Sequence, residues 1–112
     1  MASPDEIWIV DFGDPVPGEP AHHRPALVIG PAERFGDRFP FVIVCPLTTA
    51  RRGLALHVEV EPSPVNGLDQ FSYIQCELVR SVNRRRLVHR LGRVELVERE
   101  QVRDVLRNLL DV

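Results

Sequence analysis

The sequence contains no lysine, only two cysteines and no hydrophobic run that approaches the length of a membrane span. Its acidic, proline-containing N-terminus lacks the positive region and apolar core of a secretory signal. Cys45 and Cys76 fall in strand-like stretches, where a thiol is more often a small core residue than a nucleophile or half of a disulfide. The four histidines make no metal-binding pattern with them. We therefore expect a cytoplasmic protein with no membrane segment, metal or cofactor.

The absence of lysine makes arginine the only strongly basic residue, and its distribution is uneven. The first 50 residues carry three arginines and seven acids, whereas the remainder carries eleven arginines and nine acids. Six arginines and no acid lie between residues 80 and 93: Arg80, Arg84, Arg85, Arg86, Arg90 and Arg93. Arginine binds phosphate through a planar fork, so this is the stretch best suited to an anionic partner. A solvated face, or pairing with the acidic N-terminal half, remains the alternative.

Short β-branched and aromatic runs predict strands over residues 6–12, 24–30, 41–49, 54–61, 71–82 and 88–94. A break is expected near Glu77, and Asn83 is expected to cap a single helical turn. The spacing of valine and leucine predicts one helix over residues 97–110. The alternation in residues 54–61 places His57 on the polar face, as a solvated side chain. The 112 residues therefore predict one domain, 1–112, of the α+β class and mainly β: a small twisted antiparallel barrel with a C-terminal helix.

Two of these strands predict a site. The runs at 24–30 and 41–49 flank a loop with turn signals around Gly36, which is typical of an antiparallel hairpin. A turn centred there sets Arg24 opposite Leu47 or Thr48. An arginine and a threonine then meet at the open end of the hairpin. The proline-rich loop of residues 13–23 leads directly to Arg24 and is expected to form one wall of this site.

The chain resembles the MazF/PemK (Kid) toxins of bacterial toxin–antitoxin systems along nearly its whole length. The resemblance is carried by IWIVDF at residues 7–12, Gly18-Glu19, RPALVI at 24–29, VCPLTT at 44–49, HVEV at 57–60 and Cys76-Glu77 running into the arginines. It implies an SH3-like barrel of the plasmid-maintenance-toxin type. It also implies a homodimer, with single-stranded RNA bound in a groove at the dimer interface. The tail of a MazE-like cognate antitoxin would occupy the same groove.

By this resemblance the chain is a metal-independent, sequence-specific endoribonuclease and needs no cofactor. The 2′-hydroxyl of RNA attacks the adjacent phosphate, leaving a 2′,3′-cyclic phosphate and a 5′-hydroxyl, and translation and growth are inhibited. The catalytic residues implied are Arg24, Thr48 and Glu19. The residues expected to contact RNA are Thr49, His22, His23, Arg51, Arg52, Glu77, Arg80, Arg84, Arg85 and Arg86.

The chain departs from the family pattern in two places, and two other functions stay open. Pro20-Ala21 stands where many members have Gln-Gly, and Leu78 stands where a glutamine commonly follows Glu77. Proline removes a backbone donor and fixes a torsion, so the loop must follow a different path. One alternative is a CcdB-like poison of DNA gyrase with the same fold. The other is a catalytically inactive module that only binds an antitoxin.

Overall fold

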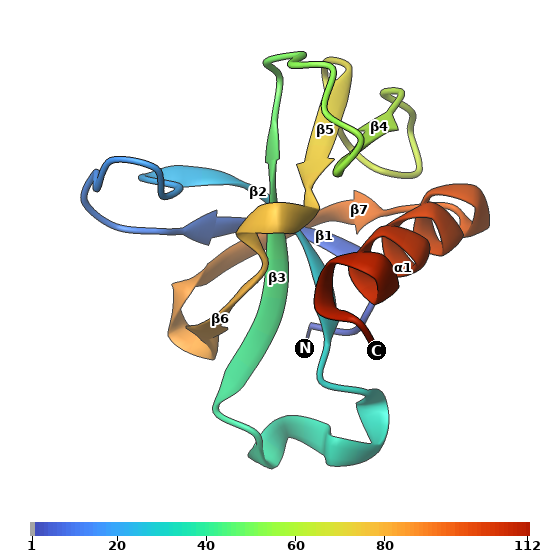
Figure 1. The fold of residues 1–112 in the computed structure, drawn as a ribbon. Helices are drawn as coiled ribbons and strands as arrows, with labels where there is room; N and C mark the ends of the chain where they lie inside the picture. The colour runs from blue at the N-terminus through green and yellow to red at the C-terminus, as the bar shows by residue number, and fades with distance from the viewer. Residues whose placement is uncertain (1) are drawn as a thin grey trace.

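The computed structural model describes residues 2–112, except for the side chain of Asp37 (Figure 1). Within these residues the strands are β1 (Glu6–Asp11), β2 (His23–Gly30), β3 (Phe41–Thr48), β4 (His57–Val60), β5 (Ser72–Gln75), β6 (Arg80–Asn83) and β7 (Leu87–Arg93). Three short 3-10 helices, η1 (Glu33–Arg38), η2 (Cys76–Leu78) and η3 (Arg84–Arg86), connect strands, and α1 (Leu96–Leu110) closes the chain. No helix of the described residues is long and apolar enough to cross a membrane. The mainly β class with a C-terminal helix is confirmed.

The strands form one strongly twisted antiparallel sheet rather than a closed barrel. Their order is β4-β5-β3-β2-β1-β7, with β6 paired to β3 beside this path. The sheet forks because β3 has two partners on one edge: β6 pairs with residues 41–44, and β5 pairs with Leu47 and Thr48 (Figure 1). No pairing joins β4 to β7 within residues 2–112. The predicted twist and antiparallel order are confirmed, and the sheet is not closed into a barrel within the described residues.

Two predicted strands are shorter than their sequence patterns indicate. The run at 54–61 forms a strand only from His57, because a turn in which the His57 amide donates to the Leu54 carbonyl (3.0 Å) precedes it. The run at 71–82 is divided into β5 and β6 by the single turn of η2. The predicted cap is confirmed, since the Asn83 side chain accepts a hydrogen bond from the Arg85 amide (2.9 Å).

The core consists of two clusters of buried side chains. The larger one includes Ile7, Leu27, Cys45 and Ile74, and α1 packs against it through Val102 and partly buried neighbours. The smaller one consists of Val10, Phe12, Ala26, Val28, Val42, Val44 and Val82, from strands β1, β2, β3 and β6 and the residue that follows β1. Because side chains alternate along a strand, these two sets face opposite sides of the sheet. The second set identifies the sheet face on which the predicted site lies.

Candidate active site

Arg24 and Thr48 lie toward the open end of the β2–β3 hairpin. The register pairs Ala26 with Pro46 and Val28 with Val44, and the pairing ends two residues short of Arg24 and of Thr48. By the alternation along each strand, both side chains belong to the face of Ala26 and Val44. The predicted hairpin is confirmed, and the closeness of Arg24 to Thr48 stays a prediction.

The surroundings of Arg24 and Thr48 leave their functional groups available to a ligand. Both residues are partly exposed. The Thr48 hydroxyl oxygen accepts a hydrogen bond from the Ala50 amide (3.1 Å). This contact fixes the oxygen and leaves the hydroxyl hydrogen free to be donated. Among the described side chains, Arg24 forms neither an ion pair nor a hydrogen bond.

Arg80 and Glu19 extend this face. Arg80 pairs with Val44 in the β3–β6 ladder, so its side chain emerges on the same side of the sheet as Thr48. Its guanidinium carbon lies 5.7 Å from the centre of the Phe12 ring, and its Nη1 lies 3.9 Å from Glu19 Oε1. The ion pair joins the loop between β1 and β2 to the face that carries Arg24 and Thr48.

The two loop histidines differ in position. His23 follows the alternation of β2 and lies on the face opposite Arg24, where its Nε2 is 3.6 Å from Asp11 Oδ2. His22 has a left-handed backbone (φ 57°) and closes the base of the loop. Its carbonyl accepts from the Phe12 amide (2.9 Å), and its own amide donates to the Gly13 carbonyl (2.7 Å). Both imidazoles are exposed, as the sequence indicates for loop residues.

Most arginines of the basic stretch make contacts within the chain. Arg84 donates to the carbonyls of Phe39 (2.6 Å) and Gly36 (3.4 Å). Arg86 donates to the Asp11 carbonyl (3.1 Å), and Arg90 forms an ion pair with Glu6 (3.1 Å). Arg85 is exposed, and its side chain makes no such contact with the described residues. The alternative of pairing with the acidic N-terminal half therefore accounts for part of this stretch.

A hollow of about 270 Å³ lies beyond Thr48, between β4, β5 and the loop after β3. Its lining includes the predicted Arg51 together with His57, Glu59 and Tyr73. Thr49 and Arg52 are exposed in the loop that follows Thr48. Sequence reasoning missed Tyr73, which pairs directly with Thr48 across β3 and β5. The alternation of residues 71–75 predicts which face of the strand Tyr73 occupies, but only the pairing of β5 with β3 shows that Thr48 is its neighbour.

His57 is buried, so the prediction of a solvated histidine is wrong. Its side chain is 3% exposed, and its Nε2 lies 2.8 Å from Oε2 of Glu77, which is 27% exposed. Gln75 pairs with His57 across the ladder, and η2 then brings Glu77 over the imidazole. The alternating pattern predicts the strand face of His57 correctly, but η2 covers that face. Glu77, a predicted RNA contact, is thus engaged by His57.

The two cysteines are inert core residues, as the sequence indicates. Both are fully buried and unbonded. The Cys76 sulfur and then burial raise the pKa of the Cys45 thiol far above its usual range, so this thiol stays neutral. Among the described residues, no group of three or more His, Cys, Asp or Glu side chains is placed to hold a metal ion.

Comparison with known proteins relates this arrangement to one family. Residues 3–111 match the family described as the PemK-like, MazF-like toxin of type II toxin-antitoxin system. The probable endoribonuclease MazF of Mycolicibacterium smegmatis is 38% identical over 81 residues, which cover 71% of each protein. The toxin MazF-mt6 of Mycobacterium tuberculosis has a similar structure, with a TM-score of 0.78, 26% identity and coverage of 96% of this chain and 97% of its own.

A further solved structure contains an endoribonuclease from a Mycobacterial species in complex with its cognate antitoxin. It has a TM-score of 0.79 and 18% identity, and it covers 100% of this chain and 97% of its own. The match to the family extends over almost every residue of the sequence, including the hairpin that carries Arg24 and Thr48. The chain therefore belongs to the family of PemK-like, MazF-like toxins of type II toxin–antitoxin systems.

Proposed function

We propose that this toxin is a metal-independent, sequence-specific endoribonuclease that cleaves single-stranded RNA and so inhibits translation and growth. The observation that supports the proposal is that Arg24 and Thr48 belong to one face of the β2–β3 hairpin, each two residues beyond the last pair, Ala26 with Pro46. The name of the M. smegmatis relative supports the same class of reaction. A cation and a hydroxyl donor at one point suit a phosphate diester.

RNA supplies its own nucleophile, the 2′-hydroxyl next to the scissile phosphate. Its oxygen forms a bond to phosphorus as the bond to the 5′-oxygen breaks, giving a 2′,3′-cyclic phosphate and a 5′-hydroxyl. The protein must orient the phosphate and stabilise the negative charge that accumulates on its non-bridging oxygens. Thr48 donates its hydroxyl hydrogen to one such oxygen, because its own oxygen already accepts from the Ala50 amide. Arg24 stabilises the charge electrostatically.

Two protons move during this step, from the 2′-hydroxyl and to the 5′-oxygen. Arginine is poorly suited to carry them, because its guanidinium stays protonated near neutral pH. Glu19 is the candidate on the same side as Thr48, through its ion pair with Arg80. Histidine is a common proton carrier in proteins, and His22 lies at the base of the same loop, whereas His23 faces away from Arg24. We assign Glu19 and His22 as the groups to test first.

The RNA strand is proposed to cross the face that carries Arg80 and to continue over the hollow lined by Arg51 and Tyr73. Thr49 and Arg52 follow Thr48 along the chain, and Arg84, Arg85, Arg86 and Glu77 are proposed to extend the contact with RNA. The proposed partners are a second copy of the chain and a MazE-like antitoxin whose tail occupies the RNA groove. An antitoxin complex of a structurally similar endoribonuclease supports the second of these partners.

Arg85→Gln is expected to weaken RNA binding and to lower its dependence on salt. Each phosphate contact that is lost reduces the slope of log K against log salt by about 0.7 for single strands. Arg85 is the member of the 84–86 run whose side chain is not bound to the described residues, so its removal leaves the fold intact. Fluorescence anisotropy with a non-cleavable 2′-deoxy strand at several salt concentrations measures the slope. Exposed Arg93→Gln is the control, and equal slopes for both variants and the wild type would show that Arg85 makes no phosphate contact.

The direct test incubates the purified protein with total RNA in excess chelator and maps the new ends. We expect 5′-hydroxyl and 2′,3′-cyclic phosphate ends at a recurring short sequence. Intact RNA after prolonged incubation would instead favour the inactive antitoxin-binding module. Intact RNA together with gyrase-dependent DNA breaks would favour the gyrase poison. Cleavage that needs an added divalent ion would contradict the metal-independent mechanism.

A further inference from the structure

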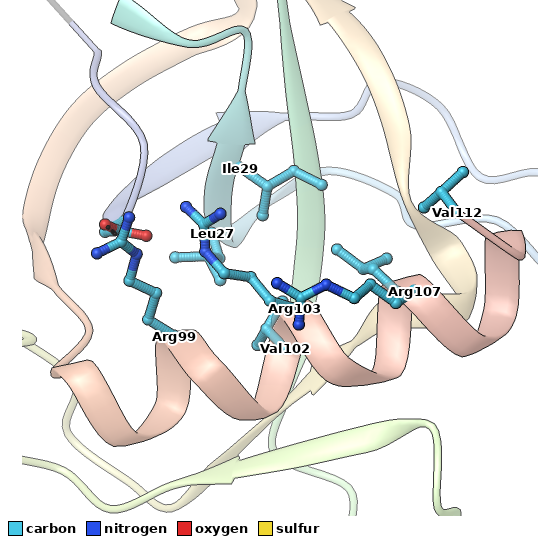
Figure 2. A pocket seen from close by; sticks show the side chains of 9 residues that line it. Leu27, Ile29, Arg99, Val102, Arg103, Arg107 and Val112 are labelled. Atoms are coloured by element: carbon cyan, nitrogen blue, oxygen red, sulfur yellow. Dashed lines mark ion pairs between the residues drawn. The ribbon is translucent and has the colours of Figure 1, made fainter.

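A second candidate site, separate from the one proposed to cleave RNA, lies between α1 and β2. A cavity of about 190 Å³ is lined by Leu27 and Ile29 of β2, by Val102 and Leu106 of α1, and by Asp5 and Val112 near the chain ends. Three arginines of α1, Arg99, Arg103 and Arg107, complete the lining. Figure 2 shows the Arg103 side chain extending from the helix toward Leu27, whereas Arg107 runs back along the helix toward Arg103. The cavity thus combines an aliphatic floor with a guanidinium rim.

Two of the three rim arginines are paired with carboxylates of the chain. Arg99, Arg103 and Arg107 recur every fourth residue and therefore share one helix face, where like charges repel. Arg99 Nε lies 3.2 Å from Asp5 Oδ2, and Arg107 donates to Asp104 (2.9 Å). Arg103, between them, forms no ion pair with the described side chains.

Apart from Asp5, the acids beside α1 line a different hollow. A separate hollow between α1 and β4 is lined by Glu59, Glu61, Glu98 and Asp104, beside the edge of the sheet. Arginine is therefore concentrated at one cavity and carboxylate at the other. This separation makes the arginine-lined cavity selective for anions, while its floor favours an aliphatic group over a bare ion.

We propose that the cavity between α1 and β2 binds an aliphatic carboxylate. The hydrocarbon part would pack on Leu27, Ile29 and Val102, and the carboxylate would accept paired hydrogen bonds from Arg103, with Arg107 or Arg99 beside it. The same chemistry is offered by a free medium-chain acid and by the C-terminus of a peptide that ends in leucine. The small volume fits one such group rather than a folded domain.

The test uses the full chain and two pairs of probes: octanoate with octanamide, and the tripeptide Gly-Gly-Leu with its C-terminal amide. Binding is measured by isothermal titration and by amide NMR shifts at Ile29, Val102 and Leu106. We expect each acid that binds to do so more tightly than its amide, with an affinity that falls as salt rises. Arg103→Gln is expected to weaken the binding of the acid about tenfold or more, as for loss of a charged hydrogen bond. Arg52→Gln, an exposed arginine outside the cavity, is the control.

The relative affinity of octanoate and Gly-Gly-Leu would identify the source of the ligand, and tighter binding of either acid supports the site. Equal binding of acid and amide, or equal binding by Arg103→Gln and wild type, would overturn the proposal. Absence of binding by both acids at millimolar concentration would also overturn it. The readout does not depend on RNA cleavage, so failure here leaves the proposed nuclease activity untouched.

Discussion

Thr48→Val is expected to lower the rate of RNA cleavage about 10²–10³-fold, the usual effect of removing one donor that stabilises charge in the transition state. Valine keeps the shape and the β-branched stem of threonine, so the strand and its pairing with Tyr73 should persist. The hydroxyl is lost, and with it the donor to the phosphate. Single-turnover cleavage of a short fluorescent RNA measures the rate.

The matched control for this substitution is Thr49→Val. Thr49 is the next residue and carries the same hydroxyl, but it follows the end of β3 and is exposed. We expect a change in rate that is small compared with that of Thr48→Val. Wild-type cleavage by Thr48→Val, with an unchanged circular dichroism spectrum, would remove Thr48 from the catalytic site.

Arg24→Ala is expected to lower the rate of RNA cleavage at least as much as Thr48→Val in the same assay. Arg24 is the second residue of β2, next to the buried part of the strand, and its head group is not needed for any described ion pair. Arg24→Lys separates charge from geometry, because lysine keeps the positive charge but not the planar fork. Recovery of most activity by lysine would indicate that charge alone is sufficient. Full activity in Arg24→Ala would contradict the proposed mechanism.

Gly92→Ala is expected to destabilise the fold by about 3 kcal/mol, near the upper end of ordinary overpacking. A Cβ at Gly92 would collide with the Val65 carbonyl and lie within 2.6 Å of the Asn66 carbonyl carbon. The loop cannot move aside easily, because buried Asn66 holds it. The Asn66 side chain accepts from the amides of Ser63 and Leu68 (3.0 Å each) and donates to the Glu61 carbonyl (2.8 Å).

Chemical denaturation of the Gly92→Ala variant measures this loss of stability, and the Gly18→Ala variant is the control. Gly18 has a positive φ of 81° but no atom within 4 Å of an added Cβ. Its replacement should therefore cost only about 1–2 kcal/mol, from the left-handed backbone. The prediction would be contradicted if the free energy of unfolding of Gly92→Ala lay within 1 kcal/mol of the wild-type value, which is about the centre of ordinary single substitutions. That result would show that the loop of residues 61–70 can move aside.

The β2–β3 hairpin is a feature that can be predicted well from the sequence. A turn near Gly36 and two β-branched runs are sufficient to predict the β2–β3 hairpin, because the pairing of a hairpin follows from its turn. The helix was also predicted within one residue at its start, since its apolar spacing is local. The need for glycine at position 92 could not be inferred in this way, because the loop that crosses Gly92 is remote from it in the sequence.

By itself, the sequence determined the strand-rich class, the C-terminal helix and the β2–β3 hairpin, because each depends on patterns within one element or one hairpin. Only the tertiary structure decided that the sheet forks at β3, that η2 buries His57 against Glu77, and that three arginines of α1 face an aliphatic cavity on β2. The physical reason is distance along the chain. These features join segments tens of residues apart, and their packing depends on the whole sheet rather than on local pattern.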